Sequence, residues 1–323
     1  MSTKFLVLGL SVCVAFLVSR FVGTQSGLLT VPTLVEQDLV QHVKGKRFLI
    51  VGGTKGIGAA LGTSLVKRGA HVVVSGRSKS EETPEGAEFI QNDVSSLANA
   101  QSLVRKDLHG QTFDTVVMTV GIITRSKLTR TAEGIEEDLA VSYMSRFVIL
   151  NELIKARAID GRKRVFIMGY PGQNMEPTNI NDINFDTTPY KQLAAHMNTV
   201  LFNEALVYEL AQKHTDLHVF GLNPGLIRTK IRDNVHGGDS SWMGMVVEKL
   251  IDWLNPSTTT YAEHGLINLM ASPLLDSITA KSFSRDLVEL PPGPWVADRI
   301  NREKAWKATQ ELILKQVPDS IAY

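Results

Sequence analysis

The stretch from residue 47 to residue 78 constrains the fold more than any other part of this chain. It opens with four apolar residues at 48–51, which is typical of a buried strand. After a glycine-rich turn, apolar residues recur at helical spacing from Ile57 to Val66, and Gly69 ends that pattern. A second apolar run follows at 71–75. The order strand, turn, helix, strand predicts a parallel α/β architecture.

Three glycines define the turn between the first strand and the helix. Gly52 lets the chain leave the strand tightly, Gly56 lets the backbone approach a pyrophosphate, and Gly58 lets the helix pack close to the sheet. The N-terminus of the following helix offers amide donors and positive potential to phosphate groups. A glycine triplet alone is often only a turn, but its position between a strand and a helix favours a bound dinucleotide.

The glycine spacing, Gly-x-x-x-Gly-Ile-Gly, resembles the first motif of the short-chain dehydrogenase/reductase family, with Val51 where the family usually has Thr. The resemblance extends over most of the chain, towards the branch that contains retinol dehydrogenases. It implies a doubly wound α/β sandwich of seven parallel strands in one domain, residues 44–317, with its site at the carboxyl ends of the strands. Strand patterns lie at 48–51, 71–75, 89–91, 113–120, 164–169, 217–222 and 280–283.

Two basic residues favour NADP over NAD as the cofactor. The second strand ends in Ser75-Gly76-Arg77-Ser78, without an acidic residue for a ribose 2′-hydroxyl. Arg77 and Lys55 are placed to hold a 2′-phosphate, although both would also suit a solvated surface. The residues expected to bind the cofactor are Gly52, Thr54, Lys55, Gly56, Ile57, Gly58, Arg77, Asp93, Gly121, Pro224, Gly225 and Thr229.

The later members of this set are assigned by the resemblance. Asp93, at the end of the third strand, takes the role of the family's adenine-binding Asp, and its alternative role is to cap a helix. Gly121 is what remains of the family's Asn-x-Ala-Gly stretch. Pro224, Gly225 and Thr229 match the Pro-Gly-x-x-x-Thr stretch that shapes the pocket of the nicotinamide carboxamide.

The family's catalytic Tyr-x-x-x-Lys pair is not matched. In the family, the lysine one helical turn beyond the tyrosine lowers the pKa of the phenol towards neutrality. Here Gln192 occupies the tyrosine position and His196 the lysine position. Tyr190, expected on the same helix, has Ala194 four residues on instead of a lysine.

The other two catalytic positions also differ from the family. Ser142 lies where the family has its catalytic asparagine, and Gly169-Tyr170 lies where it has its catalytic serine. The candidates for a non-standard acid are therefore Tyr190, His196 and Tyr170, with Ser142 as a candidate relay; packing roles are the alternative for each. No metal site is expected. Two hypotheses follow, an NADP(H)-linked oxidoreductase and a non-catalytic NADP-binding protein that acts as a sensor or scaffold.

The N-terminus predicts a membrane anchor at residues 1–22, followed by a linker at 23–43. The apolar run at 5–18 would span about 21 Å as a helix, and about 27 Å if it extends to Val22, against about 30 Å for a bilayer core. A cleaved signal peptide, and hence a secreted or luminal protein, is the alternative. More basic residues follow the run than precede it, which favours a domain facing the cytosol, on the endoplasmic reticulum or a similar organelle.

Composition excludes some partners. The net charge is +1 with both signs interspersed, so no nucleic-acid partner is expected. Cys13 is the single cysteine, so the chain cannot form an internal disulfide.

The segment 231–260 is rich in Trp and Met, which suits a small hydrophobic substrate or a membrane surface, with core packing as the alternative. The assembly is left open between a monomer and a homodimer.

Overall fold

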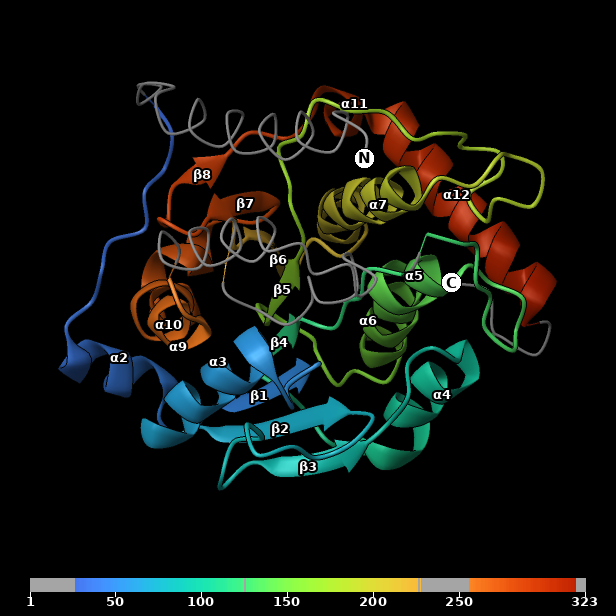
Figure 1. Cartoon of the computed structure of the whole chain (residues 1–323). Coiled ribbons are helices and arrows are strands. Elements are labelled where there is room, and N and C mark those ends of the chain that lie inside the picture. The colour runs from blue at the N-terminus through green and yellow to red at the C-terminus, as the bar shows by residue number, and fades with distance from the viewer. Residues whose placement is uncertain (1–26, 125, 226, 228–255, 318–323) are drawn as a thin grey trace, which may run out of the picture. The chain divides into compact units, whose positions relative to one another are not determined.

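A single sheet of eight strands forms the centre of the structure, in the order β3-β2-β1-β4-β5-β6-β7-β8 (Figure 1). The first seven strands in this order are parallel, as predicted, and β8 pairs with β7 in the antiparallel direction. The strands are β1 (Arg47–Val51), β2 (His71–Gly76), β3 (Glu88–Gln91), β4 (Thr115–Met118), β5 (Arg164–Met168), β6 (His218–Asn223), β7 (Lys281–Ser284) and β8 (Glu289–Leu290). The strand order reverses between β1 and β4, which makes this edge the expected ligand site.

The computed structural model describes residues 27–124, 126–225, 227 and 256–317. The chain divides into two units, residues 1–30 and residues 31–323, and the second contains all the elements named here. The predicted anchor at 1–22, the segment 231–255 and Thr229 lie outside the described residues. In the described part of the chain, no helix is both long and apolar enough to cross a membrane.

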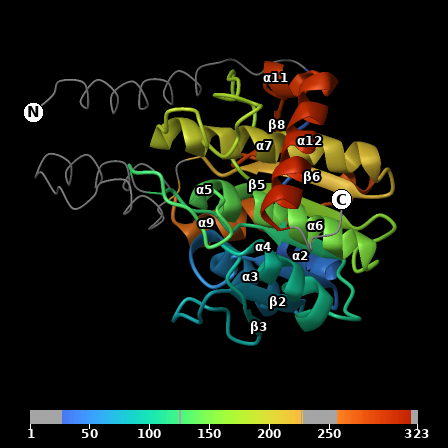
Figure 2. The same ribbon diagram turned by 90° about the vertical axis from the view of Figure 1, so that its right-hand side faces the viewer.

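Helices cover both faces of the sheet (Figures 1 and 2). One layer contains α2, α3, α9 and α10, and the other contains α4, α6, α7 and α12. The helices are α2 (Glu36–Val43), α3 (Gly56–Lys67), α4 (Leu97–Ser102), α5 (Glu137–Leu139), α6 (Ser145–Lys155), α7 (Gln192–Lys213), α9 (Thr258–Tyr261), α10 (Ile267–Ala271), α11 (Pro294–Ala297) and α12 (Arg299–Gln316). π-helical turns extend α4 over Leu103–Asp107, join α5 to α6 over Ala140–Met144, and join α9 to α10 over Ala262–Leu266.

The folded unit begins earlier than the sequence pattern indicated. We expected residues 23–43 to be a linker, but Glu36–Val43 form α2 and bury Leu39 and Val43. The carboxylate of Glu36 also accepts a hydrogen bond from the buried Arg68 at 2.8 Å. The reason is the amphipathic spacing of Leu39 and Val43, which lets so short a helix pack on α10.

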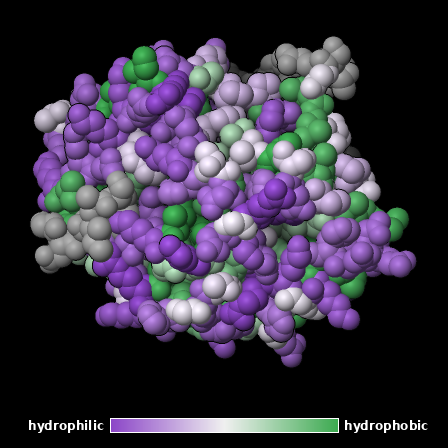
Figure 3. All heavy atoms as spheres, turned by 180° about the vertical axis from the view of Figure 1, so that it is seen from behind, coloured by the Kyte–Doolittle hydropathy of each residue, from purple (hydrophilic) through white to green (hydrophobic). Residues whose placement is uncertain are grey.

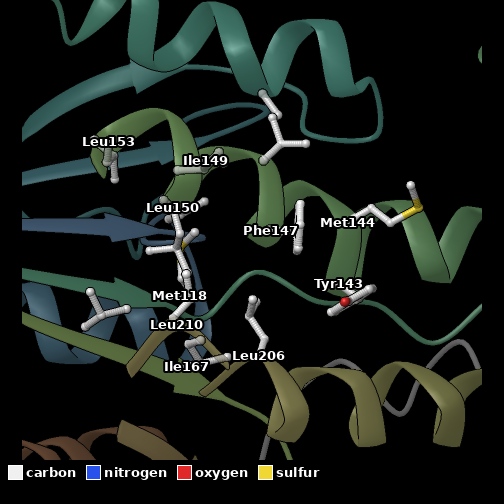
Figure 4. Packing of buried hydrophobic residues seen from close by; sticks show 14 of the residues in the cluster. Met118, Tyr143, Met144, Phe147, Ile149, Leu150, Leu153, Ile167, Leu206 and Leu210 are labelled. Atoms are coloured by element: carbon white, nitrogen blue, oxygen red, sulfur yellow. The ribbon is translucent and has the colours of Figure 1, made fainter. Parts of the chain in front are cut away.

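The largest apolar cluster lies between the sheet and the layer of α6 and α7 (Figure 4). Met118 and Ile167 point from β4 and β5 towards Leu150 of α6 and Leu206 of α7. The ring of Phe147 packs on Trp306 of α12 with centroids 4.5 Å apart. The face seen from behind in Figure 3 is mostly hydrophilic, with hydrophobic residues scattered over it. Most apolar residues of the strands and helices are therefore buried in this interior.

Candidate functional site

The glycine turn after β1 is packed too closely for side chains at two of its three positions. A Cβ on Gly52, whose φ is +91°, would lie 2.5 Å from the backbone nitrogen of Val120. A Cβ on Gly58 would lie 2.5 Å from the carbonyl oxygen of Gly52 and from Oγ1 of Thr119. Gly56 has a φ of +60° and open space beside it. The turn thus seats α3 directly on the carboxyl ends of β1 and β4.

The backbone amide of Gly56 already binds an anionic group. It donates a hydrogen bond to Oε2 of Glu82 at 2.7 Å. The loop after β2 reaches this position because Oγ of Ser80 donates to the carbonyl oxygen of Thr54 at 2.5 Å. A phosphate group would meet the same donor at the N-terminus of α3, and it would replace the Glu82 carboxylate there.

Lys55 directly precedes α3, and Arg77 directly follows β2. Both are exposed, and neither side chain makes a hydrogen bond or ion pair with another residue in the ranges that the structure describes. Asp93 is also exposed, and its Oδ1 accepts a hydrogen bond from the amide of Ser95 at 3.0 Å. The N-cap of α4 is Ser96 instead, whose Oγ accepts from the amide of Asn99 at 3.2 Å.

Gly121 and the Pro-Gly turn lie at the same edge of the sheet. A Cβ on Gly121 would be 3.4 Å from the guanidinium of Arg146 and 3.6 Å from Oγ of Ser142. Gly225, which follows β6 and Pro224, has a φ of +64°, and its amide donates to Oδ1 of Asn223 at 2.9 Å. The glycine turn, its two cations and these later turns fit a dinucleotide laid across the carboxyl ends of the strands.

The histidine at the family's lysine position has a buried carboxylate as its partner. Nδ1 of His196, on α7, lies 2.8 Å from Oδ2 of Asp138, on α5. The side chain of His196 is 24% exposed, whereas that of Asp138 is 1% exposed. The carboxylate therefore fixes the ring through Nδ1 and leaves Nε2 as the nitrogen that can exchange a proton.

Ser142 is engaged on both sides of its hydroxyl. Its Oγ donates to Oδ1 of Asp138 at 2.5 Å and accepts from the amide of Ile122 at 3.0 Å. A hydroxyl has one hydrogen to donate, so Ser142 orients Asp138 and holds the segment after β4. The same segment contains Val120, which packs on the glycine turn. The segment after β4 therefore connects the glycine turn to the Asp138–His196 pair.

Tyr190 does not lie on the helix where the sequence pattern placed it. The helix α7 begins at Gln192, with Lys191 as its N-cap in an extended conformation. The hydroxyl of Tyr190 donates to Oε1 of Glu136 at 3.2 Å and lies 3.0 Å from Oγ1 of Thr124. Burial raises the pKa of Tyr190 to about 12, a change that the Glu136 carboxylate reinforces. This is the opposite of the shift that a family tyrosine requires.

The other residues at the family's catalytic positions are less available for proton transfer. The side-chain amide of Gln192, at the family's tyrosine position, donates to the carbonyl oxygen of Thr124. Tyr170, at the family's serine position, is half-buried, and burial raises the pKa of its hydroxyl. His196 is thus the candidate whose geometry best suits proton transfer.

Sequence reasoning missed three functional candidates: Glu136, Asp138 and Arg146. The acids at 136–138 resemble the ordinary first turn of a helix, where carboxylates favour the dipole. Asp138 precedes Ser142 by four residues, so the helical spacing placed both on one face. Its contact with His196, 58 residues further on, has no sequence signal.

Glu136 gives the site a pH dependence that can be measured. Burial raises the pKa of Glu136 to about 6, and the nearby Asp138 adds to the effect. A carboxyl whose pKa is raised on folding stabilises the fold below its unfolded value of about 4.5 and loses that contribution as the pH rises through 6. The free energy of unfolding is therefore expected to lose roughly 2 kcal/mol from Glu136 between pH 4.5 and pH 7.

Urea denaturation across this range tests the prediction. Glu136→Gln should remove this part of the decline, while Glu137→Gln, the same change on a less buried neighbour, should follow the unsubstituted chain. Parallel curves for Glu136→Gln and the unsubstituted chain would contradict it.

One further cavity lies away from this site. It has a volume of about 310 Å³ and is lined by residues that include Ile154, Arg157, His214 and Asp216. These residues lie in the last turn of α6 or after the ends of α6 and α7, before β5 and β6, at the opposite edge of the sheet. The cavity therefore does not belong to the nucleotide edge.

Comparison with known proteins identifies a family and a set of similar folds. The sequence profile of the family described as short chain dehydrogenase matches residues 46–168. A Saccharomyces cerevisiae protein described as an uncharacterized oxidoreductase is 35% identical over 268 residues, covering 80% of this chain and 86% of its own. Retinol dehydrogenase 14 of Mus musculus is 22% identical, covering 83% of this chain and 86% of its own.

Solved structures agree on the fold. A short-chain dehydrogenase/reductase from Serratia marcescens superposes with a TM-score of 0.55 at 21% identity, covering 75% of this chain and 97% of its own. A protein of Mycobacterium paratuberculosis described as putative and uncharacterized superposes with a TM-score of 0.59 at 15% identity, covering 84% of this chain and 96% of its own. At these identities the similarity is one of fold.

Proposed function

Because the chain belongs to the short-chain dehydrogenase/reductase family, we propose that it is an NADP(H)-dependent oxidoreductase acting on a hydrophobic alcohol or carbonyl compound. A bound nicotinamide cofactor would supply or accept the hydride. The glycine turn would hold the diphosphate, and Lys55 and Arg77 the 2′-phosphate. Asp93 would bind the adenine, and Pro224, Gly225 and Thr229 the carboxamide.

His196 is the proposed acid and base. The observation that carries this proposal is the 2.8 Å contact between Nδ1 of His196 and Oδ2 of Asp138. With Nδ1–H donated to the carboxylate, Nε2 gives a proton to the substrate oxygen during reduction and takes it back during oxidation. Asp138 stabilises the imidazolium in the same way that a buried carboxylate does in other acid–base pairs.

The sequence and the relatives support two further parts of the proposal, the class of the substrate and the location of the chain. The relatives named retinol dehydrogenase support an apolar substrate, and the Trp- and Met-rich segment 231–260 would line its site. We place the chain on a membrane through residues 1–22, with its folded unit facing the cytosol, because of the basic residues that follow the apolar run.

The second candidate is a non-catalytic NADP-binding protein, which Gln192 at the tyrosine position favours. Turnover separates the two. The full chain is assayed with NADPH and a panel of hydrophobic aldehydes and ketones that includes retinal. NADPH-dependent reduction of any member supports the enzyme, whereas NADPH binding without turnover on the whole panel supports the second candidate.

Arg77→Ala tests the preference for NADP. Since Arg77 has no partner among the described residues, its removal should cost little stability. The loss of one charge-assisted contact to the 2′-phosphate is expected to raise the Kd for NADPH about tenfold and to leave the Kd for NADH unchanged. Calorimetric titration measures both constants.

Lys79→Ala is the matched control, since it removes a positive charge from the same loop. Equal losses for NADPH in both variants would indicate a general electrostatic effect, and an unchanged Kd in Arg77→Ala would contradict the proposed 2′-phosphate contact.

A further inference from the structure

Arg146 is a buried cation at the carboxyl ends of the central strands. It lies on α6 and is 4% exposed. Its guanidinium donates to the carbonyl oxygens of Val120 and Met168, which follow β4 and end β5, and to Oδ1 of Asn203 at 2.9 Å. All three acceptors are neutral, so the hydrogen bonds engage each nitrogen of the guanidinium without giving its charge a bonded counterion.

Hydrogen bonds through Asn203 and through the backbone and side chain of Ser142 link Arg146 to the proposed acid. The side-chain amide of Asn203 donates to the carbonyl oxygen of Ser142 at 2.8 Å. The hydroxyl of Ser142 donates to Asp138 at 2.5 Å, and Asp138 binds His196 at 2.8 Å. This set of contacts from Arg146 to His196 runs through Asn203, Ser142 and Asp138. It links α6, α7 and α5.

The charges along this chain are complementary. Burial lowers the pKa of Arg146 to about 9, and the negative charge of Asp138 opposes that change. Asp138 is also buried. Arg146 places a positive charge near the Asp138 carboxylate without taking up either of its oxygens, which bind Ser142 and His196.

We propose that Arg146 is a positioning residue for the reaction, whose buried positive charge stabilises the Asp138 carboxylate that orients His196, so that the proton is exchanged at Nε2 of His196. This inference rests on the proposed function, in which His196 is the acid. The inference gives a role to the charge of Arg146, which lies on a helix whose sequence pattern predicts apolar packing. The titratable and charged groups around the Asp138–His196 pair, among the described residues, are Arg146, Glu136 and Tyr190.

The pH dependence of kcat for carbonyl reduction tests this role, because a merely structural residue would not move it. In Arg146→Met, loss of the positive charge should favour the protonated pair, so the pH at which reduction falls to half should rise by about one unit. Arg146→Lys keeps the charge and should keep the profile of the unsubstituted chain. Lys155→Met, the same loss of charge at the far end of α6, should also keep it.

Asn203→Asp covers the case in which Arg146→Met does not fold. It retains the acceptor for Arg146 and places a negative charge beside the guanidinium, so the same upward shift is expected. An unchanged profile in a folded, active Arg146→Met or Asn203→Asp overturns the inference alone. A full chain without turnover on any substrate contradicts the proposed function, and this inference with it.

Discussion

Replacing His196 with Gln is expected to lower kcat for carbonyl reduction by about 10²- to 10⁴-fold, the range that a general acid contributes. The side-chain amide of glutamine can still donate a hydrogen bond to Asp138, but it cannot deliver a proton to the substrate oxygen. Because His196 is part of the acid–base pair and not of the glycine turn, the Kd for NADPH should stay within about threefold. Steady-state kinetics and nucleotide titration on the full chain measure the two effects separately.

Two sets of variants check this result. His214→Gln makes the same change at the C-terminal end of α7, far from the site, and should retain full activity. Tyr190→Phe and Tyr170→Phe test the other candidate acids, and both should retain most of their activity, since burial makes the two phenols weaker acids. A His196→Gln variant with normal kcat would exclude His196 as the acid, and a Tyr190→Phe variant without activity would assign the acid to Tyr190.

Gly52→Ala should have the largest effect on stability, with a loss of about 3 kcal/mol or more in the free energy of unfolding. Two costs add at this position. An alanine is strained at a φ of +91°, and its Cβ would lie 2.5 Å from the backbone of Val120, which cannot rotate away. The turn would have to open, so binding of NADPH should be lost as well.

Gly110→Ala separates the two costs. Gly110 has a φ of +74°, but no atom lies within 4 Å of a Cβ built there. This variant should therefore lose only the roughly 1 kcal/mol of the backbone conformation. Urea denaturation of both variants measures the difference, and equal losses would contradict the close packing of the turn against Val120.

The strands and the glycine turn could be predicted because their signals are local. Wholly apolar runs, such as the one at 48–51, mark buried parallel strands, and Gly52 and Gly58 are required by close backbone contacts. The short strand β8 has only two residues and no pattern of its own. The helix α2 could not be predicted, because its segment is mostly polar and its two buried residues, Leu39 and Val43, are only one helical turn apart.

The chemistry of the site depends on contacts between distant residues, which a single sequence does not reveal. The alignment placed His196 at the lysine position, but not its carboxylate partner Asp138. The start of α7 differs from the prediction, because no residue in the sequence marks the helix boundary between Tyr190 and Gln192, and the contacts of the Tyr190 hydroxyl are with the distant Glu136 and Thr124. Arg146 lies among apolar residues of α6, where a charge would ordinarily be expected to face solvent.

Transfer of deuterium from NADPH, labelled at the transferable position of its nicotinamide ring, tests the central claim most directly. The full chain is mixed with the labelled cofactor and a panel of hydrophobic aldehydes and ketones, and the products are analysed by mass spectrometry. We predict an alcohol that carries deuterium on the former carbonyl carbon, formed faster with NADPH than with NADH and lost in His196→Gln. A chain that binds neither nucleotide and labels no product would contradict the account.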